Sequence, residues 1–205
     1  MSTLAIDTAT AACSVALIEG GRTVARLHEE VGRGHAERLL PMIAELPGGG
    51  RADAVLVDCG PGSFTGVRVG LAAARALGLG WDVPVRGYSS LPLIAAQALA
   101  RRPGLERVAA VIEGGHGEVF VQGFTGTLLP MGDMASLKPD AALHAFGGVA
   151  WAGSGVPRLL ALAPGLDAAP LLPDAGEAWR LPSELAALPP RPLYGRAPDA
   201  KVKPA

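Results

Sequence analysis

Apolar and polar positions follow one another along the chain in an order that predicts an α/β fold. Short apolar or alternating runs, which are typical of β-strands, occupy residues 4–6, 13–18, 23–28, 54–57 and 83–85. Apolar residues at helical spacing predict helices over 35–46, 67–79 and 90–100. Gly20-Gly21 is a hairpin signal between the second and third runs, so we expect three antiparallel strands to open the chain.

The same order of elements begins again after the break Arg101-Arg102-Pro103-Gly104. The first strand of this second half ends in Glu113, as the first strand of the chain ends in Asp7. The strand-like runs of the second half are 107–112, 119–123, 127–129 and 149–152, and a short helix is expected over 157–162. A repeated α/β unit predicts a duplicated fold with a mixed sheet in each of two lobes.

Actin, Hsp70 and the sugar kinases share this duplicated, ribonuclease H-like architecture. We therefore expect residues 1–100 to form an N-terminal actin-like lobe. Residues 101–205 are expected to form a smaller, divergent C-terminal lobe with a proline-rich tail. The tail holds Arg191, Arg196, Lys201 and Lys203 against only Asp199, which suits either a contact with RNA or a partner, or a solvated segment.

Composition narrows the classes of function. Hydrophobic residues make up 49% of the 205 residues, enough for a sizeable core, and the net charge of −1 argues against a strongly basic nucleic-acid binder. Aromatic residues are only 4%, so stacking platforms for bases are few. No uncharged apolar stretch reaches the roughly 18–20 residues of a membrane span. We expect residues 1–7 not to be a signal peptide, because they have no basic segment and Asp7 interrupts the apolar run. We expect a cytoplasmic protein without membrane contact, with Cys13 and Cys59 as buried free thiols.

A polar turn after the first strand is a candidate phosphate site. Asp7, Thr8 and Thr10 have the groups that coordinate a hydrated cation and a phosphate between two strands. The alternative is an Asx-type turn that closes the hairpin. The mirrored turn after Glu113 offers no hydroxyl groups, which argues against a complete two-lobed phosphate clamp.

The glycine-rich stretch 60–66 precedes a predicted helix but matches no familiar catalytic loop. Val67-Arg68 follows Gly66 where a P-loop has Lys-Ser or Lys-Thr, and Pro61 and Thr65 stand where a nucleophile elbow around Ser63 needs glycine. The helix after it carries small residues on one side, which suit either packing inside its own lobe or a close subunit interface. This side consists of Gly66, Gly70, Ala73, Ala74 and Leu77. Arg68 and Arg75 share another side, available for a carboxylate or phosphate.

No residue set for metal or nucleophilic catalysis can be assembled from spacing. Gly32 and Gly34 separate His28 from His35, so the two histidines do not lie on one helix turn. The serines have ordinary explanations as turn, strand or cap residues. We therefore expect neither catalytic residues nor a metal site.

Three segments together resemble the TsaB (YeaZ) family of bacterial tRNA threonylcarbamoyladenosine biosynthesis subunits. They are Leu4-Ala5-Ile6-Asp7-Thr8-Ala9-Thr10 followed by Cys13-Ser14-Val15-Ala16-Leu17, then His35-Ala36-Glu37-Arg38-Leu39-Leu40-Pro41, and Gly60-Pro61-Gly62-Ser63-Phe64-Thr65-Gly66-Val67-Arg68-Val69-Gly70-Leu71. The third segment is highly specific. The resemblance covers most of residues 1–100 and is weak over the second half.

The resemblance implies a non-catalytic dimerisation subunit of a tRNA N6-adenosine threonylcarbamoyltransferase complex. The N-terminal-lobe helices would pair with the catalytic paralogue TsaD, and the same surface can form a homodimer. This adds His35 and Leu39 to the interface expected at Gly66, Arg68, Gly70, Ala73, Ala74 and Leu77. A P-loop ATPase, TsaE, would join, tRNA would bind through the complex, and ATP or ADP would enter there and not bind this chain tightly. The alternatives are a free-standing actin-like ATPase or small-molecule kinase, and a hydrolase or peptidase with an activated Ser63 or Cys59.

Overall fold

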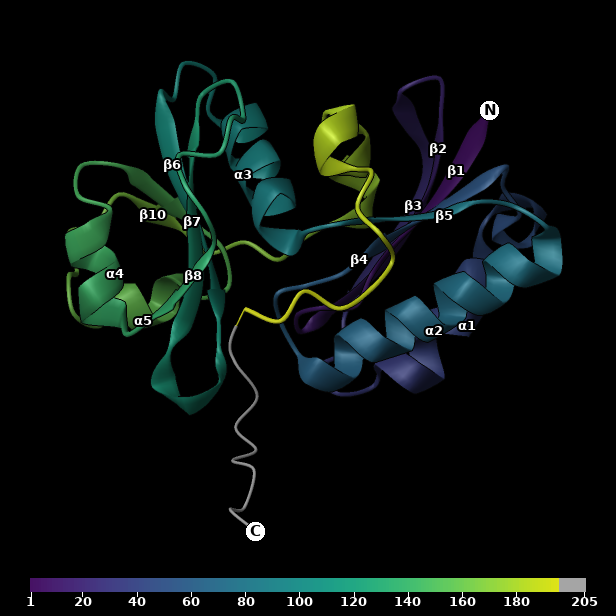
Figure 1. Ribbon diagram of the computed structural model, residues 1–205, viewed down its shortest axis with the longest axis horizontal. Helices are drawn as coiled ribbons and strands as arrows, with labels where there is room; N and C mark the ends of the chain where they lie inside the picture. The colour runs from purple at the N-terminus through teal and green to yellow at the C-terminus, as the bar shows by residue number, and fades with distance from the viewer. Residues whose placement is uncertain (196–205) are drawn as a thin grey trace, which may run out of the picture.

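The computed structural model describes residues 1–195 and contains two five-stranded sheets that stand side by side (Figure 1). The first sheet has the order β3-β2-β1-β4-β5. Its strands are β1 (Ser2–Asp7), β2 (Ala12–Glu19), β3 (Arg22–Glu30), β4 (Ala54–Asp58) and β5 (Val85–Tyr88). β1, β2 and β3 pair antiparallel, whereas β4 and β5 continue the sheet parallel to β1.

The second sheet repeats this topology, which confirms the predicted duplication. Its order is β10-β9-β6-β7-β8, so the first strand of each lobe is central, the second and third follow on one side, and the fourth and fifth on the other. The strands are β6 (Arg107–Glu113), β7 (Val119–Thr125), β8 (Ala135–Leu137), β9 (Ala150–Ala152) and β10 (Ala168–Ala169). Again two neighbouring pairs are antiparallel and two are parallel.

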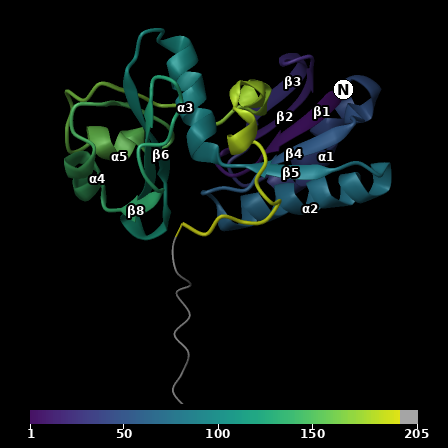
Figure 2. The same cartoon turned by 45° about the horizontal axis from the view of Figure 1, so that its top comes forward.

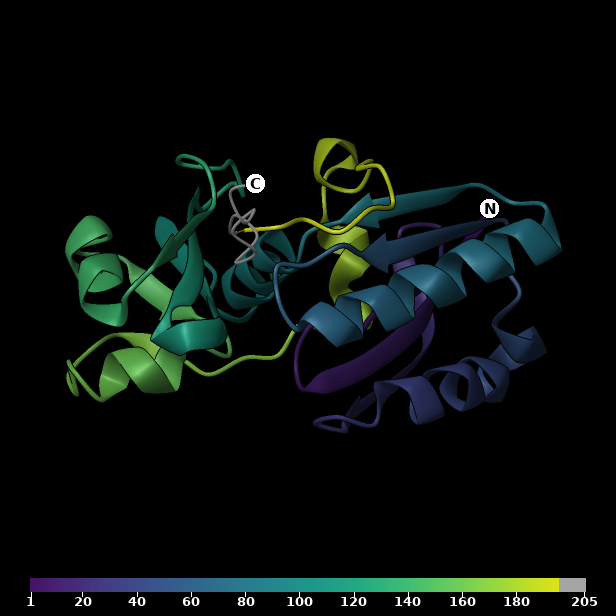
Figure 3. The same ribbon diagram turned by 60° about the horizontal axis from the view of Figure 1, so that its bottom comes forward.

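Helices cover the outer face of each sheet, and one helix lies between the sheets. α1 (His35–Glu45) and α2 (Phe64–Trp81) lie next to each other on the outer face of the first sheet (Figure 3). α4 (Pro139–Ala145) and α5 (Val156–Leu160) cover the second sheet. α3 (Ser90–Arg101) crosses between the lobes (Figure 2). Its apolar residues join a core that receives Tyr88 from the first sheet and Ile112 and Phe124 from the second.

The chain returns to the first lobe after the second sheet is complete. The 3-10 helix η3 (Ala175–Arg180) packs on β2 and β3. Leu188 then forms an antiparallel bridge to Gly87 of β5, and the backbone N–H of Leu193 donates to the carbonyl of Cys59 at 2.8 Å. The N-terminal lobe is therefore built from both ends of the described chain, which differs from the expected division into 1–100 and 101–205. Arg196, Lys201 and Lys203 of the basic tail lie outside the described residues.

Most predicted elements are present, with shifted ends. α2 begins at Phe64 instead of residue 67, because the Ser63 side chain accepts a hydrogen bond from the backbone N–H of Gly66 and caps the helix. β5 covers 85–88 instead of 83–85. The strand expected at 127–129 is wrong, since these residues form a turn and the strand comes later as β8.

Candidate functional site

The ends of three parallel strands bring polar side chains together inside the first lobe. Asp7 ends β1, Asp58 ends β4 and Tyr88 ends β5, and these strands are neighbours in the sheet. Such carboxyl ends are where open parallel sheets bind their ligands. Here the three side chains are buried, with at most 1% of their surface exposed.

One hydrogen-bond network joins these side chains. The Tyr88 hydroxyl lies 3.0 Å from Asp7 Oδ2 and donates to it, and the Asp7 Oδ1 atom accepts from the backbone N–H of Ala9 at 3.2 Å. Asp58 accepts from the Ser90 hydroxyl at 2.5 Å and from the backbone N–H of Gly60 at 2.8 Å. The two carboxyl groups also hydrogen-bond each other. Every described polar atom buried in this network has a partner.

Burial decides the protonation of the two carboxyl groups. Desolvation, reinforced by the Asp58 charge, raises the pKa of Asp7 well above its ordinary value. Desolvation also raises the pKa of Asp58 to about 6, although the hydrogen bonds from Ser90 and Asp7 oppose it. Asp7 is therefore the carboxyl group of the pair that holds its proton more strongly, and it donates a hydrogen bond to Asp58. An anion is not attracted to such a site.

The polar turn after β1 is closed by the glycine-rich loop before α2. The backbone N–H of Ser63 donates to the carbonyl of Ala9 at 2.7 Å, and the Thr8 hydroxyl donates to the carbonyl of Gly66 at 2.8 Å. Asp7, Thr8 and Thr10 are all buried. The hydrogen bond from the backbone N–H of Ala9 to the Asp7 side chain, two residues earlier, forms the Asx-type turn that was the alternative to a phosphate site. The three side chains are thus engaged within the hairpin and the loop.

Two glycines of α2, Gly66 and Gly70, face this turn. A methyl group on Gly66 would overlap the carbonyl oxygen of Thr8, and one on Gly70 would overlap the Thr8 hydroxyl. Ala74 is fully buried on the same side, and Ala73 and Leu77 are half-buried against the same core. The small side of α2 packs inside its own lobe. The expectation that Gly66, Gly70 and Ala74 contact a partner is corrected, because all three are buried inside the lobe.

The two interface residues expected on α1 are also internal. His35 is buried, and its Nε2 atom lies 3.1 Å from the carbonyl of Ala12. Leu39 is 1% exposed in the core beneath α1 and α2. Neither side chain is available to another subunit, and this part of the expected interface is corrected too.

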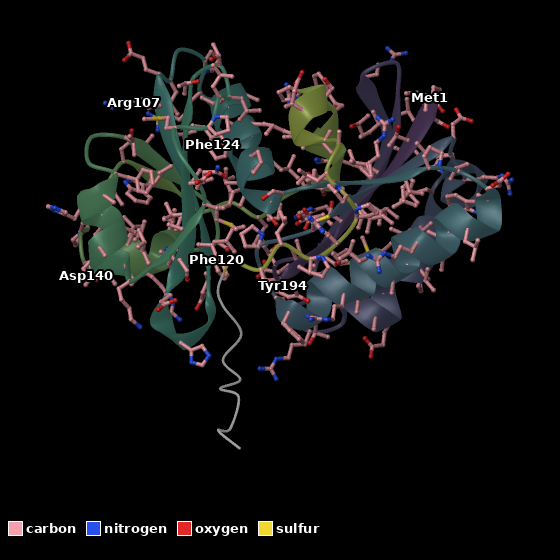
Figure 4. The ribbon with its side chains drawn as sticks, in the orientation of Figure 1. Met1, Arg107, Phe120, Phe124, Asp140 and Tyr194 are labelled. Carbon is pink, nitrogen blue, oxygen red and sulfur yellow. The ribbon has the colours of Figure 1, made fainter. Side chains whose placement is uncertain are left out.

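Arg68 and Arg75 do share one side of α2, but the returning chain occupies it. Arg68 donates to the Tyr194 hydroxyl at 2.8 Å and stacks over the Phe64 ring at 3.2 Å. Arg75 donates to the carbonyl of Pro190. Tyr194 lies beside the seam between the lobes, near Phe120 of the second sheet (Figure 4). These arginines therefore fasten the C-terminal segment to α2.

The residue of the second lobe that mirrors Asp7, Glu113, is also held by contacts within its own lobe. Glu113 at the end of β6 forms an ion pair with Arg158 of α5. The Ser154 hydroxyl accepts from the backbone N–H of Glu113 at 3.3 Å. Glu113 and Ser154 are therefore both engaged within the lobe.

The residues considered as nucleophiles are not activated. Burial raises the pKa of the Cys13 thiol to about 11 and that of the Cys59 thiol to about 12, so both stay protonated at neutral pH. Ser63 caps α2 instead of facing a base. Within residues 1–195, no group of three His, Cys, Asp or Glu side chains is arranged to hold a metal ion. In the same part of the chain no helix is both long and apolar enough to cross a membrane.

The outer sides of α1 and α2 form an apolar face that periodicity alone did not single out. We call it the α1/α2 face. Its exposed residues are Ala36, Leu40, Pro41 and Ala44 of α1 and Ala72, Ala76 and Leu79 of α2. Leu40 is 54% exposed and Leu79 is 86% exposed. Exposed apolar surface on two neighbouring helices is typical of a protein interface.

The repeated sheets and the closed turn define a two-lobed protein of the actin-like class. Residues 27–144 match the family model described as "TsaD: tRNA N6-adenosine threonylcarbamoyltransferase". The structure superimposes on YeaZ from Pseudomonas aeruginosa with a TM-score of 0.76 and 32% identity, over 94% of this chain and 99% of that chain. The chain belongs to the TsaB (YeaZ) family of tRNA threonylcarbamoyladenosine biosynthesis proteins.

Curated relatives agree over the first part of the chain. The Escherichia coli tRNA threonylcarbamoyladenosine biosynthesis protein TsaB is 45% identical over 125 residues, which is 58% of this chain and 53% of that protein. The Haemophilus influenzae protein of the same name is 42% identical over 125 residues, 58% of this chain and 52% of its own length. The matched segment thus spans about half the length of these relatives.

Proposed function

We propose that this chain is a non-catalytic subunit of a tRNA N6-adenosine threonylcarbamoyltransferase complex, and that it pairs with the catalytic paralogue TsaD. The α1/α2 face carries this proposal, because it is an exposed apolar surface on the helices that the family resemblance implies for pairing. The buried Asp7 network and the protonated thiols support the non-catalytic role. In this proposal TsaE, ATP or ADP, and tRNA join through the complex.

The first experiment measures incorporation of labelled threonine into unmodified tRNA. The mixture contains the adenylate-forming synthase, TsaD, TsaE and ATP, with and without this chain. We expect label to appear only when the chain is present. Incorporation that is the same without the chain would contradict the proposal. ATP hydrolysis by the isolated chain, abolished by Asp7→Ala, would favour the free-standing ATPase instead.

The interface is tested with a charge placed on the α1/α2 face. Leu79→Asp should weaken binding to TsaD by about tenfold or more, because a carboxylate loses its hydration in an apolar contact. Leu129→Asp is the matched control, since Leu129 is a leucine with 63% of its surface exposed, on the second lobe. Binding is measured by titration calorimetry. Equal affinities for the two variants would rule out this face as the interface.

A further inference from the structure

The free edge of the first sheet borders a groove that the proposed function does not use. β3 is the outermost strand on its side of the sheet, and η3 packs beside it (Figure 2). The β3 groove, as we call it, has a volume of about 590 Å³. It is lined by Arg22, Thr23, Val24, Ala25 and Arg26 of β3, and by Gly176, Glu177, Trp179 and Arg180 of η3. This volume lies in the range of small-ligand sites.

A bulge in β3 shapes the groove. Leu17 pairs with Ala25 and Ile18 pairs with Thr23, so Val24 has no partner in β2. In a regular strand, Thr23 and Arg26 would point to opposite faces of the sheet. Because the bulge adds one residue, both side chains reach η3.

The wall opposite β3 is firmly held. Arg26 forms an ion pair with Asp174 at 2.5 Å, and the Thr23 hydroxyl donates to the carbonyl of Gly176. The Ser14 hydroxyl accepts from the backbone N–H of Ala175 at 2.9 Å. These contacts hold η3 in place before any ligand arrives.

The groove combines positive charge with a planar surface. Three arginines line it, and two of them are paired, Arg26 with Asp174 and Arg180 with Glu177. The positive charge that is not compensated is that of Arg22. Arg22 is exposed and has no ion pair or side-chain hydrogen bond within residues 1–195. The Arg180 guanidinium lies 4.3 Å from the centre of the Trp179 ring, and this indole is 38% exposed. A free guanidinium suits a phosphate, and a stacked indole and guanidinium suit a base.

We propose that the β3 groove binds a short single-stranded RNA segment, with a base against Trp179 and Arg180 and a phosphate on Arg22. The choice of RNA as the anion rests on the proposed function. A peptide strand added to β3 fits less well, because a bulge at the edge disrupts the backbone pairing that such a strand needs. Because the net charge of the chain is only −1, we expect the RNA to contact this groove and not a wider surface of the chain.

Fluorescence anisotropy with a labelled single-stranded RNA octamer tests the proposal on the full chain, alone and bound to TsaD. We expect Trp179→Leu to weaken RNA binding about fivefold or more, the loss typical of one stacking contact. Arg22→Ala should weaken binding and reduce the slope of log Kd against log salt by about 0.7, the value for one phosphate contact with a single strand. Arg101→Ala, an exposed arginine at the end of α3, is the matched control and should bind as the native chain does.

Three results would overturn the proposal: no RNA binding in either state, equal binding by all variants, or Arg22-dependent binding of a glutamate-rich peptide without RNA binding. Thermal unfolding of each variant checks that the fold is intact. TsaD binding is measured on the same samples. If TsaD binds and RNA binding does not depend on the groove, only this inference fails. If the native chain does not bind TsaD, the proposed function fails instead.

Discussion

The paired carboxyl groups of Asp7 and Asp58 tie the stability of the first lobe to pH. The folded chain holds Asp58 with a pKa of about 6, above its ordinary value of 3.8, and raises that of Asp7 as well. At a pH between the ordinary carboxyl pKa of 3.8 and the raised pKa values of the folded chain, the folded state binds more protons than the unfolded state. The contribution of the pair to stability is therefore fully present below about pH 4 and is lost as the pH rises through 6.

Asp7→Asn should remove much of this dependence. An asparagine amide donates to Asp58 as the protonated Asp7 carboxyl does, and its carbonyl still accepts from Ala9. The Tyr88 hydroxyl retains the carbonyl of Ile6, at 3.2 Å, as an acceptor. We expect the free energy of unfolding of Asp7→Asn, relative to the native chain, to increase steadily from pH 4 to pH 8 in urea titrations.

Asp53→Asn is the matched control for this measurement. The backbone N–H and hydroxyl of Ser2 lower the pKa of the Asp53 carboxyl, so its contribution is present above its unfolded pKa and lost in acid. Its loss should give a constant difference above about pH 5. A constant difference for Asp7→Asn as well would show that the carboxyl pair does not titrate as described.

At the residue scale, the sequence indicated Asp7 but not its partners. Asp58 and Tyr88 join Asp7 only because β4 and β5 lie beside β1, and the order of strands is not visible in a local pattern. Helical periodicity correctly grouped Gly66 and Gly70 on one side of α2. It did not show whether that side faces the lobe or a partner, since small residues suit both.

At the scale of the element, α2 contains two kinds of glycine. Gly66 faces the carbonyl of Thr8, whereas Gly80 has open space around its Cα. Gly66→Ala should destabilise the protein by about 1–3 kcal/mol, because a methyl group forces the helix away from the turn. Gly80→Ala should stabilise it by about 0.5–1 kcal/mol, because alanine loses less backbone entropy in a helix.

Thermal and urea unfolding of both variants measure this pair of opposite effects. Binding of Gly66→Ala to TsaD, corrected for its folded fraction, should equal that of the native chain. A folded Gly66→Ala variant that binds TsaD weakly would instead indicate that Gly66 contacts TsaD. The long helices and strands were thus predictable from their patterns, whereas α4 was not predicted, and the cap at Ser63 and the bulge at Val24 depend on contacts made elsewhere in the chain.

At the scale of the whole molecule, the two lobes share a core, and the chain returns from the second lobe to pack on the first. α3 packs between the sheets, and η3 returns from the second lobe to cover β2 and β3. The break at 101–104 looked like a boundary because of its polar, proline-containing sequence. Its position does separate the two sheets, but the helix before it, which packs mainly on the second sheet, belongs to the core that both sheets share.

We therefore expect the two lobes to unfold together. Phe124 belongs to β7 of the second sheet and is fully buried in the shared core. Phe124→Ala should cost about 3–5 kcal/mol, and the loss should extend to the first lobe. Hydrogen–deuterium exchange read by mass spectrometry should show the buried amides of β1 and β6 accelerating by the same factor.

Leu129→Ala is the control for this comparison, because Leu129 is 63% exposed and contributes little to the core. It should leave exchange unchanged in both strands. Faster exchange in β6 with unchanged exchange in β1 would mean that the lobes open independently. Equal acceleration would mean that a change in the second lobe alters how firmly the first lobe, and with it the α1/α2 face, is held in place.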